Sequence, residues 1–308
     1  RAVWINTNGS AQSKLWWQEM GRLLQHPEDR MVFSVDGLED TNHIYRRGTS
    51  WQKIKQNMET FLAAGGRARW DFLVFKHNEH QVEMAQELAK QMGFVDFRIR
   101  KTSRFSSPFN GKTNLKTPVL RKLDKSFAQK FLEHRIDSKD IPPELIEYWL
   151  EPPQRPKYQN QDVTVRLKQI LETHPSFENY IRTTKINCIY KNRFKRIYIS
   201  AQAKLWPCCY LAGDSVGGRK TKYHLDILKN VIHRYGDRFN SLREHSLKDI
   251  LEHPWLKENL VKSFDNTPDN KTNPRLLKCG RTCGEGFNPI LSQTHKVLFS
   301  NEAPREHA

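Results

Sequence analysis

Five cysteines are the residues of this chain best suited to chemistry, and four of them form a spaced set. Cys188 stands alone, Cys208 is followed directly by Cys209, and Cys279 and Cys283 bracket three residues in the sequence CGRTC. A long, Lys-rich chain is expected to use such thiols as thiolate ligands rather than as disulfides, because the cytosol keeps thiols reduced. Disulfides alone would also leave one of the five cysteines over.

The predicted metal ligands are Cys188, Cys208, Cys279 and Cys283. Cys209 is expected to be a bystander, although Cys208 and Cys209 could exchange roles. Four thiolates suit either a structural zinc ion or an iron-sulfur cluster, because both need soft, deprotonated sulfur donors. Zinc half-sites usually consist of two C-x2-C knuckles, which this chain lacks, and a third alternative is a set of unrelated buried thiols.

The segments around these cysteines predict how they come together. Residues 186–190 and 195–200 are β-like, and the sequence RIYISAQAKLWPCC predicts a hairpin that turns near residues 201–203. Such a hairpin would return Cys208 to the neighbourhood of Cys188. A largely helical excursion over residues 223–264 then leads to CGRTC, so the whole set could close on one tetrahedral or cubane centre.

The first hundred residues alternate short apolar runs with amphipathic stretches. This pattern predicts four parallel strands joined by right-handed helical crossovers, as in a piece of a barrel or an open wound sheet. The predicted strands are 2–6, 31–35, 70–75 and 95–99, and the clearest helix is 51–64. We therefore expect an α/β fold, namely a partial (β/α) barrel of parallel strands with a small α+β cysteine-ligated cluster domain.

Polar residues follow the predicted strands, at the end of the sheet where such folds carry their chemistry. The three segments are 7–9, 34–37 and 76–78. They could line a ligand pocket, or they could be ordinary turns. Asn78, within HNEH, is expected to cap the following helix with Gln81 as its reciprocal partner rather than to belong to a histidine metal site.

Basic residues dominate the composition and gather in one segment. The formal net charge is +17 and the sequence pI is about 9.7. Residues 98–135 contain eleven Lys or Arg against two acidic residues. This segment could be a solvated face, or it could bind nucleic acid or an acidic peptide.

Residues 101–182 are expected to be a basic helical connecting region, punctuated by proline, with helices over 138–150 and 163–173. No stretch approaches the roughly 18 apolar residues of a membrane span, and the first residues do not have a signal-peptide pattern. We therefore expect a cytoplasmic protein without a membrane partner.

Two separate stretches resemble one family. INTNGS, FSVDGLEDTNHIYRRGTSW and WDFLVFKHNEHQVEMAQELAKQMGF look like the later strands of a radical S-adenosylmethionine (SAM) enzyme. The cysteine segment resembles the auxiliary-cluster extension of those enzymes, called a twitch domain and related to the SPASM domain. Cys188 and Cys208 stand at that domain's spacing, with Ala203 in the place of its glycine. The resemblance covers about residues 1–100 and 183–290.

The chain departs from this family at its defining motif. The C-x3-C-x2-C loop, which binds the cluster that cleaves SAM, occurs nowhere in these residues, and four of an expected six strands are present. Since that loop follows the first strand of the barrel, we expect an N-terminally truncated chain. As it stands, this chain is not expected to generate a radical.

The resemblance implies an activity and its cofactors. The intact protein would cleave SAM reductively to a 5′-deoxyadenosyl radical that abstracts hydrogen from a substrate. Asn8, Ser34, Asp36, Arg46 and Asn78 would hold SAM, although a surface ion pair is the alternative role of Arg46. The four ligand cysteines would hold one auxiliary 4Fe-4S cluster, beside the second 4Fe-4S cluster of the intact protein. A peptide-like substrate and a reductant such as flavodoxin or ferredoxin are the implied partners.

The sequence thus predicts four regions and leaves two functions open. The regions are a partial radical SAM barrel (1–100), the connecting region (101–182), the cluster domain (183–290) and a tail (291–308). The first function is that of a radical SAM enzyme. The alternative is a non-catalytic nucleic-acid-binding protein in which a zinc or iron-sulfur module stabilises the C-terminal half and the 98–135 segment grips RNA or DNA.

Overall fold

The computed structural model describes residues 2–102, 105, 116–120, 141–216, 221–286 and 294–299. Most of the basic segment 98–135 lies outside these residues, so the predicted nucleic-acid role of that segment stays a prediction. No helix of the described part is long and apolar enough to cross a membrane.

A five-stranded sheet organises the N-terminal half, with the strand order β1-β2-β3-β4-β9. Strands β1 to β4 are parallel, and β9 pairs antiparallel with β4 at the edge. The strands are β1 (Trp4–Thr7), β2 (Arg30–Ser34), β3 (Ala68–Leu73), β4 (Asp96–Arg100) and β9 (Thr294–Leu298). The four predicted strands and the predicted α/β class are confirmed. Residues 294–298, assigned to a tail on sequence, form the antiparallel edge strand instead.

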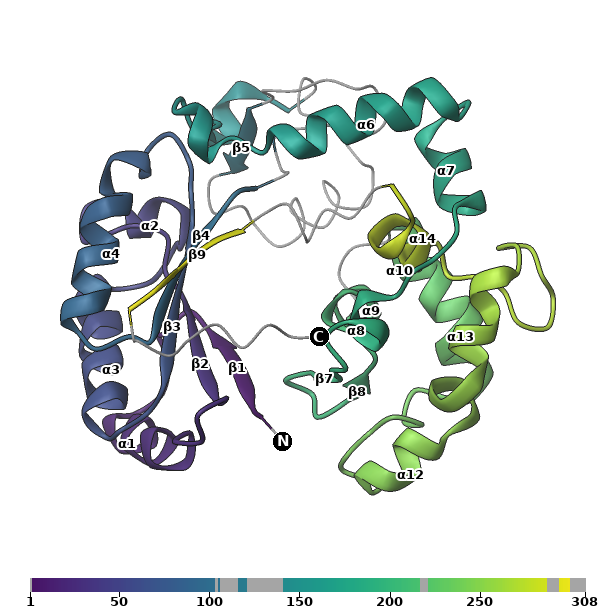
Figure 1. Ribbon diagram of the computed structural model, residues 1–308, viewed down its shortest axis with the longest axis horizontal. Helices are drawn as coiled ribbons and strands as arrows, with labels where there is room; N and C mark the ends of the chain where they lie inside the picture. Colours follow the sequence, from purple (N-terminus) through teal and green to yellow (C-terminus); the bar gives the residue numbers. More distant parts are fainter. Residues whose placement is uncertain are drawn as a thin grey trace.

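Helices cover one face of this sheet (Figure 1). They are α1 (Lys14–Leu23), α3 (Trp51–Ala63) and α4 (Val82–Gln91), with the short turns α2 (Asn42–Tyr45) and η1 (Glu79–Gln81) between them. Ser13 and Ser50 cap α1 and α3 through their side chains, which accept hydrogen bonds from Trp16 N and Lys53 N. The core between helices and sheet is rich in aromatic rings, among them Trp17, Phe33, Phe61, Trp70 and Phe97.

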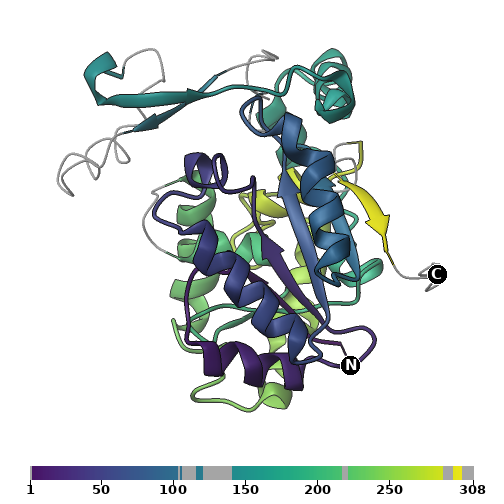
Figure 2. The same cartoon turned by 90° about the vertical axis from the view of Figure 1, so that its left-hand side faces the viewer.

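The connecting region is only partly helical. The predicted helix over 138–150 is wrong, because residues 143–145 form the short turn η3 (Pro143–Leu145) and residues 146–150 form strand β6 (Ile146–Leu150). The β-branched and aromatic residues of IEYWL favour a strand, and Pro142-Pro143 cannot lie inside a helix. Strand β6 pairs antiparallel with β5 (Thr117–Leu120), and this small sheet projects from one end of the molecule (Figure 2).

Helices follow the small sheet. After the turn η4 (Pro156–Tyr158), α6 (Gln161–Thr173) confirms the helix predicted over 163–173, and α7 (Phe177–Thr183) leads into the C-terminal half.

The elements from α8 to α14 form a second layer, here called the C-terminal module. They are α8 (Ile189–Asn192), β7 (Tyr198–Ile199), β8 (Leu205–Trp206), α9 (Cys209–Ser215), α10 (Lys222–Ile227), η5 (Leu228–Ile232), α11 (His233–Tyr235), α12 (Leu247–Glu252), η6 (Trp255–Asn259), α13 (Leu260–Lys262), η7 (Ser263–Asp265) and α14 (Leu277–Cys283). In Figure 1 this module stands across from the sheet face that the helices α1, α3 and α4 leave uncovered.

The predicted hairpin of the C-terminal module is confirmed, but one of its predicted strands is not. Strands β7 and β8 pair antiparallel, and Ala203 in the turn between them has φ = +57°. Residues 186–190 do not form a strand, since Ile186 makes only a single bridge to Gly284 and α8 begins at Ile189. The predicted helical excursion over 223–264 is confirmed by the elements from α10 to η7.

Candidate metal centre

The four predicted ligands lie at the ends of helices in the C-terminal module. Cys188 and Cys208 are the N-cap residues of α8 and α9. Cys279 and Cys283 lie on α14 four residues apart, so they share one face of that helix. Asn187 N donates a hydrogen bond to Cys283 O at 2.8 Å, which places the chain before Cys188 against the end of α14.

These four cysteines also pack against one apolar core. Cys283 is a buried member of it, and Cys188, Cys208 and Cys279 are partly buried against it. Cys209 is exposed, and its sulfur lies 3.3 Å from the hydroxyl oxygen of Tyr190. Cys209 thus differs from the other four in its packing, and its expected role as a bystander stays a prediction.

The thiols lie close enough to change one another's pKa. Hydrogen bonding between the Cys188 and Cys283 thiols lowers the pKa of Cys188 to about 6 and raises the pKa of Cys283. Burial, followed by the charges of Cys208 and Cys188, raises the pKa of Cys279 well above its usual value. Burial raises the pKa of Cys208 to about 12, with further contributions from Cys209 and then Cys188. Each of the four thiols thus responds to at least one other member of the set.

Backbone amides oppose part of the rise in pKa that burial causes in these thiols. No capping hydrogen bond of good geometry reaches either N-cap sulfur. The amides of Tyr190 and Lys191 nevertheless lower the pKa of Cys188, and those of Tyr210 and Leu211 lower the pKa of Cys208. N–H groups aimed at sulfur favour the thiolate form, which is the form that binds a metal.

The donor set fits a thiolate-bound centre in its chemistry, but it is not arranged around one ion. Within the described residues, no group of three or more His, Cys, Asp or Glu side chains is placed to hold a metal ion. A tetrahedral zinc site would need its sulfurs about 3.8 Å apart, given a Zn–S bond of about 2.3 Å. A cubane holds its four thiolates farther apart than a zinc ion does, because each thiolate binds a different iron.

A buried arginine ties together the segments that carry the cysteines. Arg275, only 5% exposed, donates to three carbonyl oxygens from two other parts of the chain. Its Nη1 reaches Thr184 O at 2.7 Å and Arg182 O at 3.0 Å, and its Nε reaches Phe264 O at 3.1 Å. This side chain therefore fixes the end of α7 and the turn η7 against the start of α14.

The glycine of CGRTC has a packing reason. A Cβ at Gly280 would lie 2.1 Å from Ile181 O, so α14 can approach α7 this closely only with glycine at this position. Asp226 fixes the start of α14, because its Oδ2 accepts a hydrogen bond from Leu277 N at 2.8 Å. Gly280, between the two cysteines, thus allows α14 to pack in the position from which it presents them.

Three of the predicted SAM contacts form one polar network at the ends of β2 and β3. The Asp36 carboxylate is buried, accepts Arg46 Nε at 2.6 Å and accepts Leu73 N at 2.7 Å. Burial raises the pKa of Asp36, and Arg46 opposes that shift. Arg46 is therefore in an ion pair, as the alternative expectation had it, but its acidic partner is buried rather than at the surface.

Asn78 does not cap the following helix. Its side chain accepts from Phe75 N at 2.7 Å and donates to Asp36 O at 2.8 Å and Leu73 O at 3.0 Å, so it joins neighbouring strand ends. The predicted partner Gln81 instead accepts a hydrogen bond from Leu38 N. The predicted capping pair is wrong because both side chains find buried partners on the neighbouring loop.

The other two predicted contacts lie on the same edge of the sheet. Ser34 is half-buried at the end of β2, and Asn8 is exposed after β1, where its Oδ1 accepts hydrogen bonds from Ser10 N and Ser10 Oγ. The polar side-chain atoms of Asp36 and Asn78 already form hydrogen bonds within the protein, so these two residues stabilise this edge of the sheet. A SAM-binding role for the five residues stays a prediction.

Sequence reasoning missed a charged face of the sheet, here called the polar face. Arg69 pairs with Asp96, and Arg98 with Asp71, while Arg100 Nη1 lies 3.4 Å from Asp71 Oδ2. These side chains alternate with the core residues of β3 and β4, in ARWDFL and DFRIR. That period of two was a signal available in the sequence, because parallel strands buried on both faces are normally apolar throughout.

The polar face meets the C-terminal module at two points. Arg196, between α8 and β7, has its guanidinium carbon 4.1 Å from the centre of the Trp4 ring, and that of Arg69 lies 4.6 Å from the same ring. On the cysteine side, Tyr210 has its pKa raised to about 12 by burial and by nearby Cys209, and Arg100 lowers it.

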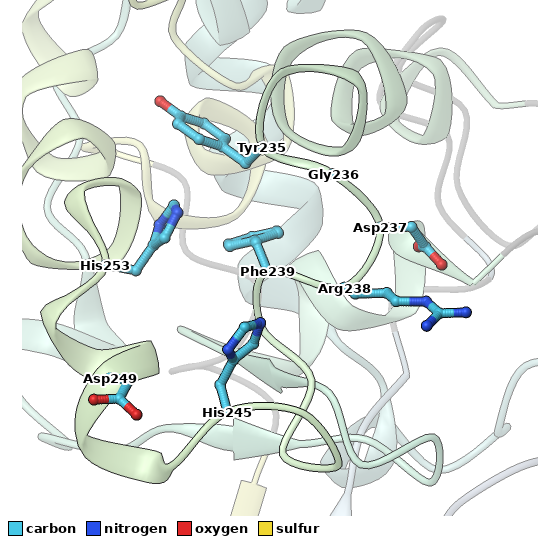
Figure 3. Close-up of a pocket in the computed structure, with 8 residues that line it drawn as sticks. All are labelled: Tyr235, Gly236, Asp237, Arg238, Phe239, His245, Asp249 and His253. Atoms are coloured by element: carbon cyan, nitrogen blue, oxygen red, sulfur yellow. The ribbon is translucent and has the colours of Figure 1, made fainter.

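A groove of about 720 Å³ lies elsewhere in the C-terminal module, near α11 and α12 (Figure 3). Its walls include Phe239, His245 and His253. The acidic groups beside it already have partners, because Asp249 belongs to the capping box of α12 and Asp237 lies 2.6 Å from Lys204 Nζ. We assign no chemistry to this groove.

Comparisons with known proteins give a distant likeness. No protein family model matches the chain, and no curated protein does. Among solved structures, SuiB of Streptococcus suis bound to S-adenosylmethionine aligns at 13% identity and a TM-score of 0.38. SuiB bound to the precursor peptide SuiA aligns at 13% identity and a TM-score of 0.39. Each alignment covers 90% of this chain and 53% of SuiB, so this chain spans about half of that protein.

Proposed function

We propose that this chain is part of a radical SAM enzyme, with a partial (β/α) barrel and an auxiliary-cluster domain, and that Cys188, Cys208, Cys279 and Cys283 hold one 4Fe-4S cluster. The observation that carries the proposal is the common packing of these four thiols, whose pKa values depend on one another. Four soft donors with amides aimed at two of them suit an iron-sulfur centre.

The turn before Cys208 supports the same proposal. The resemblance to twitch domains puts a glycine at position 203, and Ala203 has φ = +57°, in the left-handed region that favours glycine. The chain thus keeps the backbone conformation that glycine favours, although alanine stands at this position. The parallel sheet with polar strand ends is the second component that the proposal needs.

In this proposal the two halves have different roles. The cofactor SAM would supply the hydrogen-abstracting chemistry, and the residues of this chain would bind, orient and shield the reactants. Asp36, Arg46 and Asn78 would hold the strand ends in shape beside Ser34, and Asn8 would be the exposed member of the five. A peptide substrate and a flavodoxin or ferredoxin reductant belong to this proposal.

The cluster is tested by reconstituting the chain with iron and sulfide without oxygen. We expect about four irons and four sulfides per chain and the visible absorption of a thiolate-bound cluster. Cys279→Ser and Cys283→Ser should each lose most of the bound iron, whereas the matched control Cys209→Ser should keep it. Stoichiometric zinc with no iron would overturn the cluster assignment, and full iron in Cys279→Ser would overturn the ligand set.

The enzymatic part needs a separate assay, made on the protein as its source produces it. We expect reductant-dependent conversion of SAM to 5′-deoxyadenosine. A sample with its full iron content that makes no such product would refute the radical SAM role and leave a cluster-binding protein.

A further inference from the structure

A turn that follows α8 concentrates positive charge without acidic partners. Residues 185–204 contain six Lys or Arg and no acidic residue. Two of the six have carboxylate partners, because Lys185 pairs with Glu285 and Lys204 pairs with Asp237. The other four are exposed and make no ion pair within the described residues. They are Lys191, Arg193, Lys195 and Arg196, here called the basic turn.

Hydrogen bonds fold these four residues into one compact turn. Arg193 N donates to Ile189 O at 3.0 Å, and Arg196 N reaches back to Tyr190 O at 3.1 Å. The Phe194 and Tyr190 rings pack with their centres 5.7 Å apart, and the guanidinium carbon of Arg196 lies 5.4 Å from the centre of the Phe194 ring. The four cations therefore share a surface of defined shape.

Two exposed aliphatic side chains adjoin the basic turn. Ile197 is 46% exposed and Ile199 is 52% exposed. They lie two residues apart on the extended chain at β7, so their side chains leave the same face of that chain, while Tyr198 between them packs against the core of the C-terminal module. Exposed apolar side chains with charged neighbours are typical of a surface that binds another polypeptide.

The basic turn lies where the two halves of the molecule meet. Strand β7 stands on the side of the C-terminal module that faces β1 (Figure 1), and the guanidinium carbon of Arg196 lies 4.1 Å from the centre of the Trp4 ring. On the other side, Cys188 is the N-cap of α8, and its carbonyl oxygen accepts a hydrogen bond from Asn192 N at 2.8 Å. A polypeptide bound here would therefore lie beside one of the proposed cluster ligands.

We propose that the basic turn, with Ile197 and Ile199, binds an acidic peptide segment that also carries aliphatic side chains. Its carboxylates would pair with the four cations, and its aliphatic side chains would cover the two isoleucines and remove them from water. This inference rests on the proposed function and deepens it, since it names the kind of peptide that would be held next to the cysteines.

Nucleic acid and an anionic membrane are the competing partners for a basic surface. Single-stranded nucleic acid is bound through exposed aromatic rings on which its bases stack, whereas the exposed apolar side chains here are isoleucines and Phe194 packs against Tyr190. A bilayer is a broad surface, and the contact between Arg196 and Trp4 places the basic turn against the sheet instead of at an outer end of the molecule. Both features favour a peptide.

The test is fluorescence anisotropy of the full chain with a short labelled peptide that alternates Glu with Val. We expect this peptide to bind, and a matched peptide that alternates Gln with Val to bind about tenfold more weakly. Lys191→Gln and Arg193→Gln should each weaken binding about threefold, the value of one exposed charge pair. Lys229→Gln is the control and should leave the affinity unchanged, because Lys229 is also exposed and makes no ion pair within the described part of the chain.

The aliphatic contribution is tested with a second pair of variants. Ile199→Thr keeps a β-branched side chain and should weaken binding about threefold, because less apolar area is removed from water in the complex. Leu225→Thr is the control, since Leu225 is also 52% exposed but lies in α10. Melting temperatures equal to that of the unaltered chain show that these exposed substitutions leave the fold intact.

Several results would overturn the proposal. They are no binding of the Glu–Val peptide, equal binding of the Gln–Val peptide, or equal weakening in Lys229→Gln, which would indicate only the diffuse effect of the high net charge. Tighter binding of oligouridylate, or of vesicles of phosphatidylcholine and phosphatidylserine, would replace the peptide by that partner. Iron content on the same samples separates this surface from the cluster. Peptide binding without iron would refute the cluster alone, and full iron without peptide binding would refute this surface alone.

Discussion

Replacement of Arg275 by methionine should unfold the C-terminal module selectively. The side chain is 5% exposed and donates to Phe264 O, Arg182 O and Thr184 O. Methionine is an unbranched apolar side chain of similar length to arginine, but it has no hydrogen-bond donor. The three carbonyl oxygens would then stay buried without the cation that binds them.

The magnitude follows from those three acceptors. A buried carbonyl that loses its donor costs about 1–3 kcal/mol, so three cost roughly 3–9 kcal/mol. The variant no longer buries a charged guanidinium, which returns several kcal/mol. We expect a net loss of about 4 kcal/mol, a large part of the stability of one domain.

Urea denaturation and hydrogen exchange read by mass spectrometry would measure this effect. Exchange should rise in peptides from residues 177–286 and stay unchanged in those from β2 and β3. Arg234→Met is the matched control, because Arg234 also donates to two carbonyl oxygens, of Lys271 and Thr272, but is exposed. It should cost under about 1 kcal/mol. A loss below 1 kcal/mol for Arg275→Met, or equal exchange throughout the chain, would refute the reasoning.

Three other substitutions probe the same architecture. Gly280→Ala should lower the free energy of unfolding by about 3 kcal/mol, because its Cβ would clash with α7. Gly213→Ala is the control, since Gly213 has open space around it and alanine there should be neutral or stabilising. The urea midpoints of the two variants measure the difference. Ala203→Gly should stabilise by about 1 kcal/mol, measured as a higher melting temperature, because φ = +57° strains alanine. Arg46→Met should cost about 3 kcal/mol at neutral pH by leaving the buried Asp36 carboxylate unpaired. The pKa of Asp36 is raised in the folded protein, so its contribution to stability is present at low pH and lost as pH rises through the folded pKa. The loss of stability in Arg46→Met should therefore shrink on acidification. Urea titrations at several pH values measure it.

Hydrophobic periodicity predicted the sheet because the strands and helices of the N-terminal half are locally consistent. Apolar runs such as MVF and the stop at Gly65 place β2 and the end of α3 without any tertiary information. The 138–150 prediction failed for the opposite reason. IEYWL forms a strand because β5 lies beside it, and that partner is distant in sequence.

Side-chain roles were predicted less well than elements. Asn78 has the residue type and position of a helix cap, but its side-chain amide hydrogen-bonds Phe75 N and Asp36 O instead. Asp36 is distant in sequence, and only the folded sheet brings its carbonyl oxygen within reach. Residue type and spacing drew attention to the cysteine set, and its role as a ligand set stays a prediction. Arg275 was not, because a buried arginine whose partners are backbone carbonyls leaves no signal in the sequence around it.

The polar face departs from the usual composition of a parallel sheet. A parallel sheet normally buries both faces against apolar layers, yet here one face presents Arg98 and Arg100 with a single carboxylate between them. The C-terminal module contacts the sheet through Arg196, whose guanidinium carbon lies 4.1 Å from the centre of the Trp4 ring. The Arg98 and Arg100 side chains remain 22% and 37% exposed, so water offsets part of the cost of placing their charges beside Asp71. The sheet can therefore keep this polar face without an apolar layer packed against it.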